Sequence, residues 1–235
     1  MSESPPGAGR GDPRAEMVRY MRALAERGLN TGCAGNGSVR VPEGLLITPS
    51  GLLPEELRAQ DLIVLSPAGE APPGGRRPSS EWRLHCRILE RRPEANAVLH
   101  AHPPYATALA CARRDLPAFH YMLAVAGGAS VRCADYATFG TEALAGNVLR
   151  ALRGRGACLM ANHGALSLGP DLRAAYLLLL ELENLCRQYW LSLQVGAGPA
   201  LLSAAQMEEA LERFRDYRRP GPAEPDPEAP DSGGS

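Results

Sequence analysis

Two histidines separated by one residue stand where a strand should end. The stretch Ala97-Val-Leu-His-Ala-His102 runs directly into Pro103-Pro104. Its apolar residues favour a strand, and a double proline cannot donate to a strand ladder, so the strand should stop there. Because residues two apart in a strand share a face, His100 and His102 would lie side by side. The pair is suited to a divalent metal, but two hydrogen-bonded core histidines would show the same spacing.

Two other side chains could complete a ligand set. His163 follows an expected buried strand, 157–161, and precedes a turn, so it is a third histidine at a strand end. Glu81 falls in the first turn of a helix capped by serine, where the helix dipole favours a carboxylate. Three imidazoles and one carboxylate suit Zn²⁺ or a similar divalent ion.

The remaining histidines are interpreted as structural. His85 lies four residues after Glu81 on the same helix face and could be a ligand or support one. A histidine in a helix is more often packed or solvated, so His85 is left out of the ligand set. His120 adjoins Tyr121 and is treated in the same way.

The absence of lysine restricts the chemistry. All 25 residues counted as Lys+Arg are arginine, which fits a GC-rich codon bias. Schiff-base catalysis needs a lysine amine, and a Walker-type phosphate loop needs its lysine, so both are excluded.

Composition describes an ordinary globular chain. Its 235 residues are 45% hydrophobic and 22% charged, with a net charge of -1. One substantial domain is expected, and the charge gives no argument for nucleic acid or an anionic membrane. The apolar run Leu177–Leu180 is far too short for a membrane span. The N-terminus lacks signal-peptide features, and six scattered cysteines without a C-x-x-C motif favour free thiols, so a cytoplasmic protein is expected.

The periodic pattern predicts one domain over residues 13–218, between disordered tails at 1–12 and 219–235. Helices are expected near 13–27, 54–57, 81–91, 104–113, 141–153, 172–193 and 203–217, and strands near 39–41, 45–47, 62–65, 97–102, 118–125, 130–133, 157–161 and 165–168. Helices and strands alternate, and several strands are joined by short turns. The expected fold class is therefore a three-layer α/β/α domain on a largely antiparallel sheet.

Ordered motifs now identify a resemblance. The chain resembles the class II aldolase/adducin family from residue 14 to residue 218, and is most like the branch that cleaves L-fuculose 1-phosphate. The motifs that carry the resemblance are Gly28-Leu-Asn, Ala34-Gly-Asn36, Leu46-Ile-Thr-Pro-Ser-Gly51, Pro78-Ser-Ser-Glu-Trp-Arg83, Ala95-Asn-Ala-Val98, His100-x-His102, His120-Tyr-Met122, Ala126-Gly-Gly128, Tyr136-Ala-Thr-Phe-Gly-Thr141 and His163-Gly164.

The resemblance implies a metal site and a mechanism. His100, His102 and His163 would be zinc ligands, and Glu81 would be both a resting ligand and the catalytic base. The metal would act as the electron sink when the C3–C4 bond of a ketose 1-phosphate breaks to give dihydroxyacetone phosphate and an aldehyde such as L-lactaldehyde. Tyr121 would handle the proton on the aldehyde oxygen, reaching the site of a neighbouring subunit in a cyclic homotetramer.

The resemblance also implies substrate contacts. Phosphate would lie among Asn36, Ser50, Gly51, Ser79 and Ser80, a lysine-free anion cradle of hydroxyls, glycine backbone and a helix N-terminus. The two serines could equally be simple helix caps, and both roles can coexist. The aldehyde pocket would be walled by Phe139 and Tyr217, and Cys33 replaces the threonine typical of the phosphate loop, which removes one hydroxyl contact.

Two alternatives remain. A pentulose-5-phosphate 4-epimerase or a methylthioribulose-1-phosphate dehydratase would use the same metal ligands. A non-catalytic adducin-like binding module would keep the fold, but it has no need of all four metal-site residues.

Overall fold

A seven-stranded sheet forms the middle of the protein. The structure is a computed structural model that describes residues 11–217. The strand order is β3-β2-β1-β4-β7-β6-β5, and every pairing is antiparallel except that of β5 with β6. The strands are β1 Asn36–Val41, β2 Gly44–Ile47, β3 Ile63–Leu65, β4 Ala97–Ala101, β5 Cys133–Ala134, β6 Ala157–Met160 and β7 Gly164–Gly169.

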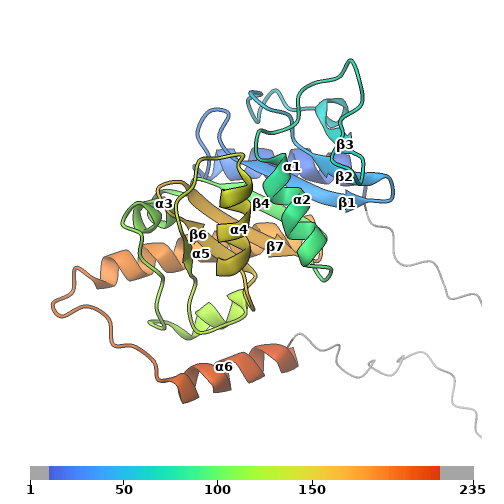
Figure 1. Ribbon diagram of the computed structural model, residues 1–235. Helices are drawn as coiled ribbons and strands as arrows, with labels where there is room; N and C mark the ends of the chain where they lie inside the picture. Colours follow the sequence, from blue (N-terminus) through green and yellow to red (C-terminus); the bar gives the residue numbers. More distant parts are fainter. Residues whose placement is uncertain (1–10, 218–235) are drawn as a thin grey trace, which may run out of the picture.

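Helices cover both faces of this sheet (Figure 1). One face carries α1 Pro13–Glu26, α3 Pro104–Cys111 and α5 Leu172–Ser192, and the other carries α2 Trp82–Arg91 and α4 Glu142–Ala151. Side chains alternate along β4, so that Leu99 packs in the first apolar cluster and Val98 in the second. The expected three-layer α/β/α fold with a largely antiparallel sheet is confirmed.

Three further elements lie outside these layers. They are the 3-10 helices η1 Ala59–Asp61 and η2 Tyr121–Ala126, and the last helix, α6 Ala204–Tyr217. In Figure 1, α6 stands apart from the sheet and packs against η2. Within the part of the chain that the structure describes, no helix is long and apolar enough to cross a membrane.

Three of the predicted helix caps are in place. Asp171 and Thr141 each accept a hydrogen bond from the backbone N–H three residues later, and Ser203 and Gln206 form a reciprocal capping box. Asp12, assigned to the N-terminal tail from the sequence, caps α1. Residues 1–10 and 218–235, which make up most of the two predicted tails, lie outside the described residues.

Three local predictions were wrong. The strand expected over 118–125 is instead η2, because the His120 ring accepts a hydrogen bond from the Met122 N–H and starts a turn. The strand expected over 130–133 is reduced to β5, and Val131 forms only an isolated bridge. The helix expected over 54–57 is instead a turn at residues 54–56. Short apolar segments carry too little periodic signal to distinguish strand from 3-10 turn.

Candidate metal centre

Three neighbouring strands bring the candidate ligands to one end of the sheet. Because β1, β4 and β7 are antiparallel in turn, the start of β1, the end of β4 and the start of β7 coincide. Asn36 begins β1 opposite His100, and Ala101 pairs with Ala165. His163 directly precedes β7, and Glu81 is the N-cap residue of α2. The four residues predicted as ligands therefore meet, although up to 82 positions separate them in the sequence.

The side chains of these four residues converge. The Nε2 atoms of His100 and His102 lie 3.0 Å apart, and one potential ligand atom of each of the three histidines lies within 4.8 Å of the others. The Glu81 carboxylate lies 3.2 Å from His100 Nε2 through Oε2 and 3.7 Å from His163 Nε2 through Oε1. This is a nitrogen-rich set with one carboxylate, the composition that zinc-type ions prefer.

Hydrogen bonding fixes the form of the first ligand. His100 Nδ1 lies 2.9 Å from the carbonyl oxygen of Ala165, which can only accept, so Nδ1 carries the proton. His100 Nε2 is therefore bare and presents its lone pair to His102 and Glu81. Burial lowers the pKa of His100 to about 3, which keeps the ring neutral, as a metal ligand must be.

Glu81 is held at the helix end with one oxygen unpaired. Its backbone N–H donates to Ser79 Oγ at 3.3 Å, in the turn just before α2. The serine cap predicted from the sequence, with Glu81 in the first helical turn, was wrong, because Glu81 is itself the N-cap residue and the helix start has no side-chain capping bond. Burial acts to raise the pKa of the Glu81 carboxyl, but His100 and the hydrogen bond from Asn36 outweigh it and lower that pKa. Glu81 Oε1 is buried and has no hydrogen-bond partner among the described residues.

These features fit a divalent cation. A buried carboxylate oxygen without a partner is costly, and so is the bare Nε2 of His100 facing Glu81 Oε2 across 3.2 Å. A cation bound by the three histidines and Glu81 would remove both costs. The donor set of this structure therefore suits the metal that the sequence predicts.

A cavity of about 310 Å³ opens over the candidate ligands. All five residues predicted to contact phosphate line it: Asn36, Ser50, Gly51, Ser79 and Ser80. Phe139, predicted for the aldehyde pocket, is at its rim with 62% of its surface exposed, and Cys33 also lines the cavity. One cavity thus holds the candidate metal ligands and the candidate phosphate cradle.

Two glycines allow the close approach of backbone to the site. Gly35, with φ +78, lies over the amide of Asn30, where a Cβ would come within 2.3 Å of Asn30 Nδ2. Asn30 also accepts a hydrogen bond from the His102 N–H at 3.0 Å, so it connects the loop that contains Gly35 to the segment that carries His102. At Gly164, a Cβ would lie 2.5 Å from the Ala101 carbonyl oxygen and 2.7 Å from the His102 ring.

One predicted residue is not brought to the cavity within this chain, and the side chain of a second lies outside the described residues. Tyr121 lies on η2, is 54% exposed and faces Phe214 of α6, with the ring centroids 6.3 Å apart. It lines a separate cavity of about 370 Å³ between η2 and α6. The backbone of α6 ends at Tyr217, whose side chain lies outside the part that the structure describes. Their roles stay predictions.

One residue of the site was missed from the sequence. His85 is fully buried and lies 2.5 Å from Asn36 Oδ1 through Nε2, and Asn36 Nδ2 donates to Glu81 Oε2 at 2.9 Å. The position of His85 one helical turn after Glu81 was the signal. The partner Asn36 could not be identified from that spacing, because it comes from a distant strand.

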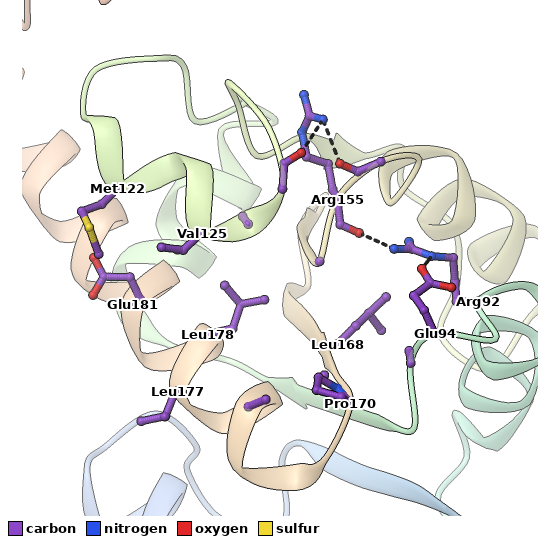
Figure 2. Close-up of a pocket in the computed structure, with 17 residues that line it drawn as sticks. Arg92, Glu94, Met122, Val125, Arg155, Leu168, Pro170, Leu177, Leu178 and Glu181 are labelled. Carbon is purple, nitrogen blue, oxygen red and sulfur yellow. Dashed lines mark hydrogen bonds and ion pairs between the residues drawn. The ribbon is translucent and has the colours of Figure 1, made fainter. Parts of the chain in front are cut away.

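A larger cavity lies elsewhere in the described part of the chain. It measures about 690 Å³ and lies between η2, the 154–156 turn and α5, with Met122, Leu177 and Leu178 on its apolar side (Figure 2). At its polar end Arg155 donates to backbone carbonyls, including that of Ser130 at 2.7 Å. It shares no lining residue with the candidate metal cavity.

Comparisons with known proteins agree with this geometry. Residues 15–190 match the family model described as the class II aldolase and adducin N-terminal domain. A 5-methylthioribulose-1-phosphate/5-deoxyribulose-1-phosphate aldolase of Rhodospirillum rubrum is 49% identical over 204 residues, covering 87% of this chain and 91% of the relative. The L-fuculose phosphate aldolase of Escherichia coli is 42% identical over 202 residues, covering 86% and 94%. A solved L-fuculose 1-phosphate aldolase superposes with a TM-score of 0.83 at 40% identity, covering 88% of this chain and 98% of that one. The chain belongs to the class II aldolase and adducin family.

Proposed function

We propose that this chain is a zinc-dependent aldolase that reversibly cleaves a ketose 1-phosphate to dihydroxyacetone phosphate and a small aldehyde. The observation that carries the proposal is the single cavity in which three histidines and Glu81 converge beside a lysine-free anion cradle. A single domain over residues 13–218 would supply one set of these residues per chain.

The residues of the cavity suggest how the reaction is divided. A divalent cation on the histidines would supply Lewis-acid polarisation of the C2 carbonyl and the adjacent hydroxyl oxygen. The serines and glycine backbone of the cradle would hold the phosphate, and Asn36 has a second amide N–H for a phosphate oxygen. Glu81 would return a proton to C3 of the three-carbon fragment after C3–C4 cleavage, and would remove it in the reverse direction.

A product assay tests the substrate class. L-Fuculose 1-phosphate, 5-deoxyribulose 1-phosphate and 5-methylthioribulose 1-phosphate share the reacting carbons and differ beyond C4, so the relatives' names make all three candidates. We expect at least one to yield dihydroxyacetone phosphate and an aldehyde, detected by coupled reduction. No release of dihydroxyacetone phosphate from any of these ketose 1-phosphates would contradict the proposal.

The same assay separates the alternatives. A 4-epimerase would return an isomer of a pentulose 5-phosphate without free aldehyde, and a dehydratase would release water while keeping the carbon chain intact. A non-catalytic adducin-like module would change none of the substrates. The names of the similar proteins, all aldolases among those compared above, favour cleavage.

Tyr121 is proposed to act in a neighbouring subunit of a homotetramer. Its exposure and its position outside the chain's own candidate metal cavity support this assignment. The apolar side of the cavity in Figure 2, next to η2, offers surface for a second copy. Gel filtration with light scattering reports the assembly, and a monomer would contradict it.

Six free cysteines are consistent with the proposed cytoplasmic location.

Replacing Tyr121 should affect one half of the reaction. Tyr121→Phe should slow C3–C4 cleavage about 10²-fold, because it removes the group that takes the proton from the C4 hydroxyl as the aldehyde forms. Exchange of the C3 proton of dihydroxyacetone phosphate should change little. Tyr136→Phe, at another exposed tyrosine, is the control. Mixed assemblies of Tyr121→Phe and Glu81→Gln chains should regain cleavage if the residues act across subunits, and equal slowing of cleavage and exchange would argue against the role.

A further inference from the structure

A line of buried polar side chains leads from the sheet to Glu81. Ser38 Oγ lies 2.7 Å from His85 Nδ1, and His85 Nε2 lies 2.5 Å from Asn36 Oδ1. Asn36 Nδ2 then donates to Glu81 Oε2 at 2.9 Å. All four residues are buried, in a region that otherwise packs apolar side chains of α2 and the sheet.

Because the last acceptor is a carboxylate, the donor and the acceptor of every hydrogen bond in this line are fixed. An ionised carboxylate only accepts, so the Asn36 amide must turn its NH₂ group to Glu81 and its oxygen to His85. His85 must then carry its proton on Nε2. Its Nδ1 is left bare and can only accept, so Ser38 donates. Each donor has one acceptor, and no member can be reversed without leaving a buried polar atom unpaired.

This order singles out one oxygen of Glu81. Oε2 is engaged by Asn36 and lies near His100, whereas Oε1 is unpaired and faces His163. Without His85, the Asn36 amide could rotate, and its oxygen could then confront the carboxylate. We propose that His85 is a positioning residue that fixes the Asn36 amide and thereby leaves Glu81 Oε1 available for proton transfer. The proposal rests on the role of Glu81 as base given above.

The cost of burying His85 supports a dedicated role. The ring is fully buried on α2 next to apolar neighbours such as Ile88, where a leucine would avoid the desolvation of two ring nitrogens. Burial lowers the pKa of His85 to about 4, so the ring is neutral and has one donor and one acceptor. The donor is used by Asn36 and the acceptor by Ser38.

Three variants separate positioning from packing. His85→Leu keeps the bulk and removes both hydrogen bonds. His85→Gln can donate to Asn36 and accept from Ser38, so it should restore the zinc affinity and the proton exchange that His85→Leu loses. Ile88→Val trims the neighbouring helical turn without touching the polar line. For each variant, zinc affinity is measured by chelator competition, and proton exchange of dihydroxyacetone phosphate by NMR. The histidine tautomer is read from long-range ¹H–¹⁵N correlations in the zinc-free full chain.

We expect the His85 signal to report an Nε2–H tautomer. In His85→Leu, zinc affinity and the kcat of exchange should each fall roughly 10–100-fold, as for the loss of other groups that orient metal ligands. KM should change less than about threefold, because the serine and glycine contacts of the cradle remain. His85→Gln and Ile88→Val should both stay near the parent.

The possible failures are distinguishable. An Nδ1–H tautomer, or unchanged zinc affinity and exchange in His85→Leu, would overturn the positioning role. A similar loss in Ile88→Val would mean that packing explains the effect, and would also overturn it. The tautomer and the zinc affinity need no substrate. If the parent binds zinc but shows no exchange or cleavage, the proposed function fails, and these two measurements still decide what His85 does.

Discussion

Glu81→Gln should abolish proton exchange on dihydroxyacetone phosphate while leaving the fold and metal site in place. A glutamine can still offer an oxygen to the Asn36 amide, which now donates to Glu81 Oε2 at 2.9 Å. What it lacks is a basic oxygen at the position of Oε1. Loss of a general base typically costs about 10²–10⁴ in rate, so exchange should fall by that factor. Solvent deuterium incorporation followed by NMR measures it directly.

Glu183→Gln is the matched control for this variant. Glu183 is a half-buried carboxylate, and it accepts from the backbone N–H groups of Tyr105 and Ala106 at the start of α3. A glutamine there should lower stability and leave exchange within about threefold, because the residue lies outside the candidate cavity. Normal exchange in Glu81→Gln, or an equal loss in both variants, would remove Glu81 as the base.

Much of this site could be predicted because its signals are local. The alternation of side chains along a strand was enough to place His100 and His102 on one face, and Pro103 marked the strand end. The serines before Glu81 indicated a helix start, and α2 begins directly after Glu81, although no serine side chain caps it. In each case the physical cause lies within a few residues of the position concerned.

The contacts that the sequence did not predict join residues far apart in the chain, and they depend on how the strands pair. His85 and Ser38 are 47 positions apart, and His85 and Asn36 are 49 apart. Their contact exists because β1 pairs with β4 beneath α2, which no single helix position can indicate. The error in predicting a strand over 118–125 has the opposite cause. There a local hydrogen bond to His120 overrides a short apolar pattern.

Removal of the metal should abolish cleavage, and zinc should restore it. With no lysine in the chain, imine formation cannot provide the electron sink for C–C cleavage. Exhaustive chelation of the full chain should therefore reduce cleavage to background, and one equivalent of Zn²⁺ should return it. The thermal midpoint should rise together with activity, since a ligand at 100 times its Kd adds about 2.7 kcal/mol of stability.

Histidine variants connect that effect to this site. His102→Ala removes a half-buried imidazole, so the fold should tolerate it better than a change at fully buried His100. It should lose most of the bound zinc and the zinc-dependent rise in thermal midpoint. His120→Ala, outside the cavity, should keep both. Cleavage that survives exhaustive chelation would refute metal catalysis. Zinc retained by His102→Ala but lost from His120→Ala would place the ion elsewhere, because the converging Nε2 atoms allow no such pattern.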